Sequence, residues 1–296
     1  MTAVLQCPAA AAGDGRRLAA QLGVPMHVVD VHRFPDGELK VTVGPAAATT
    51  ILYMPLDAPN DKLLTLLFAA EALRRGGARR LVLVAPYLCY MRQDAAFHPG
   101  EAISQKVVGP LIAHAVDRVV TVDAHLHRTH DIHEVFPGIA AEDLSAMPAI
   151  AEALAGTLDP RTVVVGPDEE SAPWVADLAG RLGLAHAVGH KTRQGDRSVA
   201  ITFAGASLLD GRPVLLVDDI VSSGGTLVSC AKALIAAGAA SIDCVVTHAL
   251  FPAAMMREFE RAGIRSLRST TSVPHPTNAI RLDGLLAAAL REETAA

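Results

Sequence analysis

Short apolar runs rich in β-branched residues alternate along this chain with longer stretches rich in alanine and leucine. Runs that are apolar at every position are typical of strands buried on both faces, and the stretches between them predict helices. The alternation therefore predicts an α/β fold of mainly parallel sheets flanked by helices. The expected strands are 27–31, 50–54, 80–85, 118–123, 162–166, 213–217 and 241–247, and the expected helices are 63–76, 103–115, 171–182 and 226–237.

Two strand–helix–strand segments, which begin at Ile51 and at Arg212, resemble each other. When Asp57 is set on Asp218, the same offset aligns four further pairs: Thr65 with Thr226, Leu73 with Leu234, Gly77 with Gly238 and Val84 with Val245. One offset fits the loop, the helix and the turn, so we favour a duplication over the chance likeness of two such units. A chain of 296 residues also suits two domains, predicted at 1–144 and 145–296.

A glycine-rich loop follows the expected strand 213–217 in the second copy and consists of Ser222, Ser223, Gly224, Gly225 and Thr226. Such a loop at the carboxyl end of a parallel strand lets backbone N–H groups, hydroxyls and a helix N-terminus converge on a phosphate. The preceding Asp218 and Asp219 suit sugar hydroxyls or magnesium. The combination predicts a ribose phosphate site, and the alternative is a plain helix cap beside a solvated acidic turn.

The first copy lacks both glycines and one of the carboxylates, so only the second copy is expected to bind the sugar phosphate. The offset aligns Gly225 with Leu64. We expect Gly225 to need the backbone freedom of glycine, and Leu64 to be buried under its helix. Near the N-terminus, Gly13-Asp14-Gly15 lacks the third glycine of a dinucleotide fingerprint and is interpreted as a turn.

Charge and composition exclude several classes of protein. There are 26 lysines and arginines against 31 aspartates and glutamates, and the net charge of −5 argues against a nucleic-acid or membrane partner. No uncharged apolar run is long enough to span a bilayer, and no basic segment precedes an apolar one at the N-terminus. Four cysteines without a Cys-x-x-Cys pair form neither a disulfide framework nor a zinc site, so we expect a reduced, cytoplasmic protein.

Further motifs occur in a fixed order along the chain: Arg33–Glu38, Tyr90–Asp94, Pro99–Ser104, Val122–His125, Gly166–Asp168 and Lys191–Arg193. Together with the segment 217–226 they resemble the ribose-phosphate pyrophosphokinase (PRPP synthetase) family, from Phe34 to Ile280. The resemblance implies two tandem phosphoribosyltransferase-like domains, of which only the second keeps the loop. It also implies the conversion of ATP and ribose 5-phosphate into 5-phosphoribosyl 1-pyrophosphate (PRPP) and AMP, with Mg²⁺ as cofactor.

The resemblance also implies roles for individual residues. Lys191 and Arg193 become the catalytic cations that close over the ATP phosphates, and His125 and Asp168 become magnesium ligands. The resemblance gives ATP contacts to Phe34, Asp36, Glu38, Arg92 and Gln93, and ribose 5-phosphate contacts to Asp218, Asp219, Ser222, Ser223, Gly224, Gly225 and Thr226. Because the hairpin that carries Phe34 serves a neighbouring subunit in relatives, a homo-oligomer of at least two chains is expected. The other histidines of that segment, His127, His130 and His133, are interpreted as loop residues.

The chain departs from the family pattern at three places. Ser222 stands where an acidic residue is frequent, Ala95 and Ala96 stand where a basic residue is frequent, and Glu169-Glu170 replaces small residues. Two alternatives remain open: a phosphoribosyltransferase that consumes PRPP, and a non-catalytic regulatory paralogue. The motif 33–38 argues against the first alternative, and the presence of Lys191, Arg193 and the complete loop argues against the second.

Overall fold

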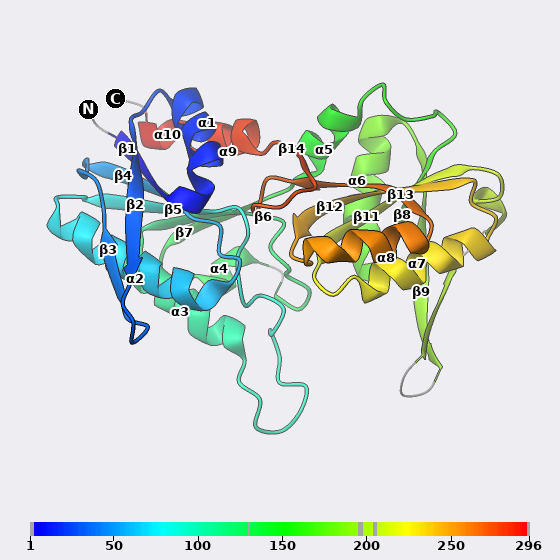
Figure 1. Cartoon of the computed structure of the whole chain (residues 1–296), viewed down its shortest axis with the longest axis horizontal. Coiled ribbons are helices and arrows are strands. Elements are labelled where there is room, and N and C mark those ends of the chain that lie inside the picture. The colour runs from blue at the N-terminus through cyan, green and yellow to red at the C-terminus, as the bar shows by residue number, and fades with distance from the viewer. Residues whose placement is uncertain (1–2, 130, 195–197, 204–205, 295–296) are drawn as a thin grey trace. The chain divides into compact units, whose positions relative to one another are not determined.

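The computed structural model describes residues 3–129, 131–194, 198–203 and 206–294, without the side chains of 191–194, 198–200 and 206. The chain divides into two compact units (Figure 1). The first unit comprises Met1–Leu144, Ser272–Pro274 and Leu282–Ala296, and the second comprises Ser145–Thr271 and His275–Arg281. The segment from Leu282 onward therefore belongs with the first unit, whereas the division made from the sequence assigned it to the second.

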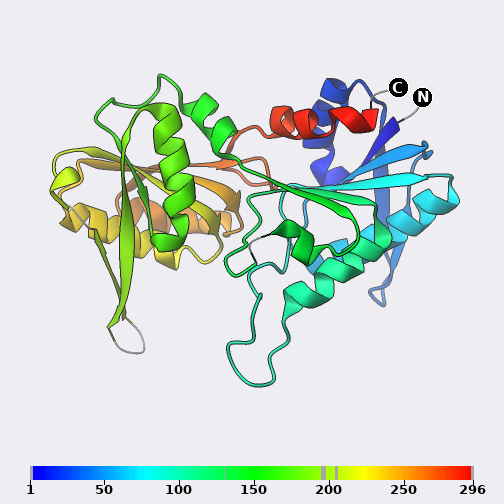
Figure 2. The same ribbon diagram turned by 180° about the vertical axis from the view of Figure 1, so that it is seen from behind.

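The first unit is a seven-stranded sheet in the order β3-β2-β1-β4-β5-β6-β7. Its strands are β1 (Ala3–Pro8), β2 (Met26–Arg33), β3 (Leu39–Thr42), β4 (Thr49–Tyr53), β5 (Arg80–Ala85), β6 (Arg118–Val122) and β7 (Ala140–Leu144). Its helices are α1 (Ala12–Leu22), α2 (Pro59–Arg75), α3 (Ser104–Ala115), α4 (Ile132–Val135), α9 (Asp283–Ala289) and α10 (Arg291–Thr294). All neighbours are parallel except the β2–β3 hairpin at the sheet edge. Helices α1, α9 and α10 cover one face, and α2 and α3 the other (Figures 1 and 2).

The second unit repeats this plan, with the strand order β10-β9-β8-β11-β12-β13-β14. Its strands are β8 (Val163–Gly166), β9 (Ala185–Gln194), β10 (Ser198–Phe203), β11 (Pro213–Val221), β12 (Ser241–Ala249), β13 (Ile264–Thr270) and β14 (Asn278–Ile280). Its helices are α5 (Met147–Leu154), α6 (Ala172–Leu182), α7 (Gly225–Ala236) and α8 (Met256–Arg261). Short 3-10 turns occur at Ala9–Ala11, Glu169–Ser171, Ala206–Leu208 and Ala253–Met255. An antiparallel hairpin, β9–β10, again forms the edge, and α7 and α8 cover the face opposite α6 (Figure 2).

Strand register refines the predicted repeat. Val84 on β5 and Val245 on β12 keep the offset found in the sequence, and so do the turn glycines Gly77 and Gly238, both at positive φ. The preceding strands do not keep it. Val84 pairs with Tyr53, and the offset would place Val214 opposite Val245, but Val245 pairs with Val217. The alignment of Asp57 with Asp218 therefore does not hold in the sheet, because the two copies differ in length between the first strand and the helix.

The core of the second unit between its sheet and α7 and α8 is aliphatic with two aromatic rings. Phe251 and Phe259 meet edge to face with ring centroids 5.0 Å apart, and both are buried. Leucine, valine and cysteine side chains from β11, β12 and α7 surround them. Among the described residues, no helix has the length and apolar character that crossing a membrane requires.

Candidate active site

The glycine-rich loop connects β11 to α7 at the carboxyl end of the sheet of the second unit. Gly224 is the N-cap of α7 with φ 74° and ψ −2°, and no side chain caps the helix. Gly225 and Thr226, in the first turn, are exposed, as is Ser223. Gly224 has no side chain with which to cap the helix, so the first N–H groups of α7 and the positive end of its dipole lie at the loop. This is the local arrangement that accepts a phosphate.

Gly224 is the glycine that this loop requires. A Cβ atom there would lie 2.5 Å from Cε1 of Phe259, and its positive φ is unfavourable for other residues. At Gly225 the nearest atom to an added Cβ is Oγ of Ser223 at 3.9 Å, and φ lies outside the left-handed region. The expectation that Gly225 needs glycine's backbone freedom was wrong, because the chain turns one residue earlier.

Asp218 and Asp219 lie within β11 rather than in the loop, since the strand runs on to Val221. Neighbouring residues of a strand point to opposite sides, so the two carboxylates leave the end of β11 in different directions. Asp219 is buried, and its Oδ1 accepts a hydrogen bond from the backbone N–H of Ile220 at 2.7 Å. Asp218 is half-buried, and its Oδ1 accepts from the N–H of Asp219 at 3.1 Å.

The first unit has no such loop at the corresponding place. There α2 begins at Pro59, so extra helix occupies the position of the second unit's loop. The hydroxyl of Thr65 is buried in that helix and donates to the carbonyl of Asp61 at 2.9 Å, whereas Thr226 is exposed. Lys62 already neutralises Asp57, with Nζ 2.5 Å from Oδ1. These features support the prediction that only the second copy binds a sugar phosphate.

Leu64 corrects a further expectation. Its side chain is 46% exposed on α2, not buried under the helix. The cost of roughly 2–5 kcal/mol typical of truncating a buried leucine therefore does not apply to it.

Three non-glycine residues with positive φ lie at the carboxyl edge of the first unit's sheet. Ala58 follows β4 with φ 47°, Tyr90 follows β5 with φ 62°, and Asp123 follows β6 with φ 41°. The hydroxyl of Tyr90 donates to Oδ1 of Asn60 in the first turn of α2. Such conformations cost roughly 1–3 kcal/mol each and cluster at binding sites. Their position on three successive strands marks this edge as the candidate ATP side.

The loop between β5 and α3 carries Arg92 and Gln93. The side chain of Gln93 donates to the carbonyl of Ala95 at 3.1 Å, and Arg92 is exposed. Glu101 accepts the backbone N–H groups of Phe97 at 2.8 Å and His98 at 3.2 Å, which closes the far turn of the loop. Burial raises the pKa of the Cys89 thiol to about 12, so this cysteine stays protonated beside the loop.

Arg128 is a residue that the sequence reasoning missed. Its Nη1 lies 2.8 Å from Oδ1 of Asp94, whose side chain is only 3% exposed, and its guanidinium lies 5.2 Å from the ring centroid of Phe97. Arg128 therefore ties the loop after β6 to the loop that carries Gln93. It brings a cation beside Ala95 and Ala96, where the chain lacks the basic residue frequent in relatives. The only signal for Arg128 in the sequence is the pair Ala95 and Ala96, because the missing basic residue suggests that another residue supplies the charge.

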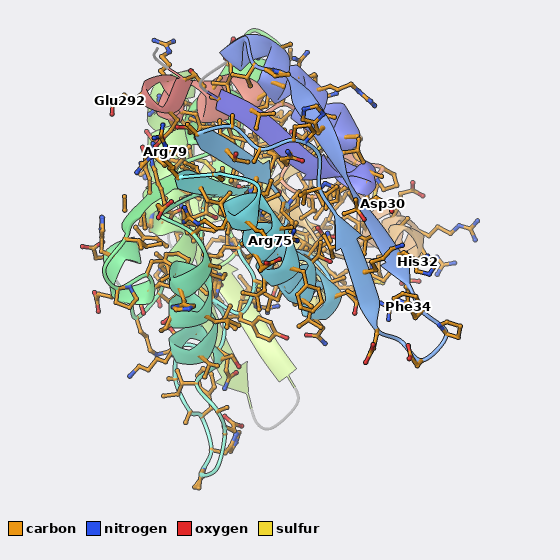
Figure 3. All side chains as sticks on the ribbon, turned by 90° about the vertical axis from the view of Figure 1, so that its left-hand side faces the viewer. Asp30, His32, Phe34, Arg75, Arg79 and Glu292 are labelled. Carbon is orange, nitrogen blue, oxygen red and sulfur yellow. The ribbon has the colours of Figure 1, made fainter. Side chains whose placement is uncertain are left out.

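Phe34, Asp36 and Glu38 form the tip of the β2–β3 hairpin. Phe34 is 40% exposed, and its ring meets that of His32 edge to face at 4.8 Å (Figure 3). Oδ1 of Asp36 accepts the N–H of Glu38 at 3.1 Å, and Gly37 supplies the positive φ of the turn. The tip is a well-formed turn, and Arg33 pairs with Asp61 of α2 at its base.

The metal candidates lie in different units and are described separately. In the first unit the rings of His125 and His127 meet edge to face, with Nε2 of His127 3.0 Å from Nδ1 of His125. His127 is thus a direct neighbour of the candidate ligand. In the second unit Asp168 follows β8 and is half-buried. His133 is exposed beside Asp131, as expected of a loop residue, and His130 lies outside the described residues.

The candidate catalytic residues Lys191 and Arg193 lie on β9, paired in the hairpin with Ile201 and Val199 of β10. Their side chains lie outside the described part of the chain, so their role stays a prediction.

Comparison with known proteins decides the family. Residues 12–115 match the N-terminal domain of ribose phosphate pyrophosphokinase, and residues 142–275 match the phosphoribosyl transferase domain. The chain is 32% identical to the ribose-phosphate pyrophosphokinase of Methanopyrus kandleri, covering 88% of this chain and 89% of that one. It is also 32% identical to that of Methanobrevibacter smithii, covering 93% and 95%. This chain belongs to the ribose-phosphate pyrophosphokinase family.

The fold of a ribose-phosphate pyrophosphokinase accounts for both units. The crystal structure of phosphoribosylpyrophosphate synthetase from Mycobacterium smegmatis is 25% identical and matches with a TM-score of 0.85 over 98% of each chain. The predicted fold class, two domains of mainly parallel sheet flanked by helices, is thereby confirmed.

Proposed function

We propose that this chain transfers diphosphate from ATP to the C1 hydroxyl of ribose 5-phosphate and releases PRPP and AMP. The C1 oxygen forms a bond to the β-phosphorus, and the bond from that phosphorus to the oxygen bridging to the α-phosphate breaks. AMP leaves with that oxygen, and the hydroxyl proton is released. The observation that carries the proposal is the uncapped N-terminus of α7 behind Gly224, in a chain of this family.

The second unit binds ribose 5-phosphate in this proposal. The phosphate lies against the N–H groups of Gly225 and Thr226, with Ser222, Ser223 and Thr226 as hydroxyl donors. The buried Asp219 and half-buried Asp218 accept from the ribose hydroxyls. The hydroxyl of Ser222 donates a hydrogen bond to the phosphate, although relatives frequently have an acidic residue at this position.

The first unit binds ATP through Arg92 and Gln93. The hairpin of a neighbouring subunit supplies Phe34 as a stacking face for adenine, and Asp36 and Glu38 as acceptors for its amino group. Arg128 holds the Gln93 loop by its ion pair with Asp94. Lys191 and Arg193 stabilise charge on the transferred diphosphate. Preorganised cations of this kind act most strongly on charge that develops in the transition state.

Magnesium is the cofactor of this proposal, and the donor set fits it in part. At the carboxyl edge of the second unit, Asp168 follows β8, and Asp218 and Asp219 lie on the neighbouring strand β11. Carboxylate oxygens are the ligands that Mg²⁺ prefers. His125 offers nitrogen, a less usual ligand for this ion. We assign His125 and Asp168 as ligands. When bound, the ion would neutralise the ATP phosphates and polarise the transferred group.

A homo-oligomer of at least two chains follows from the role given to Phe34. Large apolar side chains are exposed on β2, on the hairpin tip and on α2 and α3 of the first unit. They are Val31, Phe34, Leu64, Phe68, Val107 and Leu111. Figure 3 shows the hairpin with Asp30, His32 and Phe34 beside α2, which carries Arg75. Four buried free thiols suit the cytoplasmic location that we also propose.

The test is an assay of the purified chain with ATP, ribose 5-phosphate and Mg²⁺, in which AMP and PRPP are detected by chromatography. The proposal expects equal amounts of both products and none without ribose 5-phosphate. AMP formation without PRPP, or neither product, would overturn it. A parallel assay with PRPP and purine or pyrimidine bases distinguishes the phosphoribosyltransferase alternative. Mixing with an active relative tests for a regulatory paralogue.

A further inference from the structure

The second unit contains a polar pocket of about 400 Å³ at the amino ends of its strands. The pocket is lined by the first residues of β11 and β12, by β13, and by the segment that joins α5 to β8. The glycine-rich loop lies at the other end of β11. Leu215 in the pocket wall lies seven positions before Ser222, which is roughly 23 Å of extended chain at about 3.3 Å per residue. The pocket is therefore separate from the proposed ribose 5-phosphate site.

Both carboxylates of the wall already have cationic partners. A bulge in β13 sets both Arg265 and Ser266 opposite Asp243. Nε of Arg265 lies 3.1 Å and Oγ of Ser266 2.6 Å from Oδ1 of Asp243, and these donors hold the pKa of Asp243 below its ordinary range although burial opposes them. Asp159 pairs with Arg161 at 3.1 Å. Each carboxylate of the wall is thus paired with an arginine other than Arg268.

Arg268 supplies the unbalanced charge. It is half-buried, and among the described residues its guanidinium has no hydrogen bond and no ion pair within 4.0 Å. Asp243 attracts it electrostatically from farther away. The hydroxyls of Ser241 and Thr162 in the same wall likewise have no hydrogen-bond partner among the described residues. A half-buried cation with two hydroxyl donors, and with the nearby carboxylates neutralised, suits an anion.

The first unit shows what occupies the corresponding place there. The offset that aligns Val84 with Val245 also aligns Val82 with Asp243 and Arg80 with Ser241. The strand pairing agrees, because Val82 pairs with Arg118 between β5 and β6, and Asp243 pairs with Ser266 between β12 and β13.

A carboxylate fills that place in the first unit. Glu293 of α10, with a side chain only 5% exposed, accepts from Nε of Arg80 at 2.5 Å and from Nη1 of Arg118 at 2.9 Å. These contacts hold the pKa of Glu293 below its ordinary range. The same face at the same end of the repeated sheet thus encloses an anion in one copy and a pocket in the other.

We propose that this pocket binds a small organic anion, through a carboxylate or a phosphate group. Arg268 pairs with the anionic group, and Ser241 and Thr162 donate to it. The ligand takes the place that Glu293 fills in the first unit. Because it binds at the edge of the sheet opposite the loop, it does not compete with ribose 5-phosphate.

The experiment is calorimetric titration of the full chain with succinate and, separately, with methyl phosphate, with and without saturating ribose 5-phosphate. In the presence of saturating ribose 5-phosphate, the proposal expects one saturable site for at least one probe. Without ribose 5-phosphate, methyl phosphate should also bind at the glycine-rich loop, and this second binding event should disappear when ribose 5-phosphate is added. Succinate alone would identify a carboxylate ligand, and methyl phosphate alone a phosphate ligand. This proposal rests on the pocket alone and not on the proposed function. Loss of binding in Arg268→Gln reports on the pocket whether or not the chain makes PRPP, and loss of ribose 5-phosphate binding at the loop leaves it untouched.

Variants assign the site. Arg268→Gln should weaken binding about tenfold or more, whereas Arg181→Gln, at an exposed arginine of α6, should leave it unchanged. Ser241→Arg, which reproduces Arg80 of the first unit, should tighten binding. Thermal melting verifies that each variant is folded. If Arg268→Gln does not fold, the change in affinity of Ser241→Arg tests the site instead. Absence of saturable heat for both probes up to about 20 mM, or unchanged binding in the two pocket variants, would overturn the proposal.

Discussion

Replacing Gly224 by alanine is the sharpest test of the loop geometry. Gly224 combines a left-handed backbone with a close approach to the buried Phe259, whose Cε1 and Cζ would lie 2.5 and 2.7 Å from the new Cβ. The backbone term for a non-glycine residue is about 1–2 kcal/mol. Overpacking against an aromatic ring in a filled core adds roughly 1–3 kcal/mol. We therefore expect Gly224→Ala to lower the free energy of unfolding by about 2–5 kcal/mol.

Gly225→Ala is the matched control, one residue further on. It has an ordinary φ and no atom closer than 3.9 Å to the new Cβ. Alanine favours a helical position over glycine by roughly 0.5–1 kcal/mol, so this variant should be as stable as the wild type or more so. Urea unfolding followed by the fluorescence of Trp174, the single tryptophan, reports on the second unit, because Trp174 lies in α6.

The Gly224→Ala substitution should also weaken the binding of ribose 5-phosphate. To relieve the contact with Phe259, the chain at Gly224 must move, and the N–H groups of the first turn of α7 move with it. We expect KM for ribose 5-phosphate to rise at least about tenfold in Gly224→Ala, which is about 1.4 kcal/mol of binding, with KM for ATP little changed. Equal stability of the two alanine variants, or an unchanged KM for ribose 5-phosphate in Gly224→Ala, would refute the reasoning.

Four further changes test the remaining assignments. Lys191→Ala should lower kcat about a hundredfold, or about 3 kcal/mol, with ribose 5-phosphate affinity retained in a direct titration, and near wild-type turnover would contradict a catalytic role. Phe34→Ala should raise KM for ATP but not for ribose 5-phosphate, and a fully active monomer in sedimentation would exclude a shared site. Arg128→Ala should raise KM for ATP more than Arg128→Lys does, because lysine keeps the charge beside Asp94, and equal effects would mean that the charge is not needed. Glu293→Gln should lower stability by roughly 1–3 kcal/mol at pH 7. Because the pKa of Glu293 is lowered by folding, its contribution is present above the ordinary value of 4.5 and is lost as pH falls through the folded value, so urea unfolding curves of wild type and variant should converge toward pH 3.

Local patterns predicted the central strands well and their ends poorly. The strand 80–85 has the predicted limits, because an apolar run bounded by arginine and proline leaves little choice. The strand 213–217 continues to Val221, because pairing with β12 carries the strand past two aspartates that interrupt the apolar pattern. Gly13-Asp14-Gly15 lies inside α1 rather than in a turn. Position 15 has no room for a side chain, because an added Cβ would meet Sγ of Cys7 at 2.6 Å. Close packing of helix on strand, not a turn, requires that glycine.

The candidate site was predictable where its chemistry is local. The glycine-rich loop and the helix that follows it lie where the sequence indicated. The need for glycine at Gly224 rather than Gly225 depends on Phe259, which is distant in sequence, and no local pattern shows such a contact. Arg128 was missed for the same reason, since its partner Asp94 belongs to another loop. The early start of α2 at Pro59 could have been predicted, because proline is common in the first turn of helices.

The return of the chain to its first unit affects the order in which the protein can fold during synthesis. Domains usually fold as they leave the ribosome, the N-terminal one first. Here the first unit cannot complete its fold until α9 and α10 are made, and both are translated after the second unit. Until then Arg80 and Arg118 lack the carboxylate of Glu293. The later-made half can therefore finish first. A nascent chain arrested before residue 282 would expose the β5–β6 face of the first unit, and a protease or chaperone would meet an unfinished N-terminal half beside a finished one.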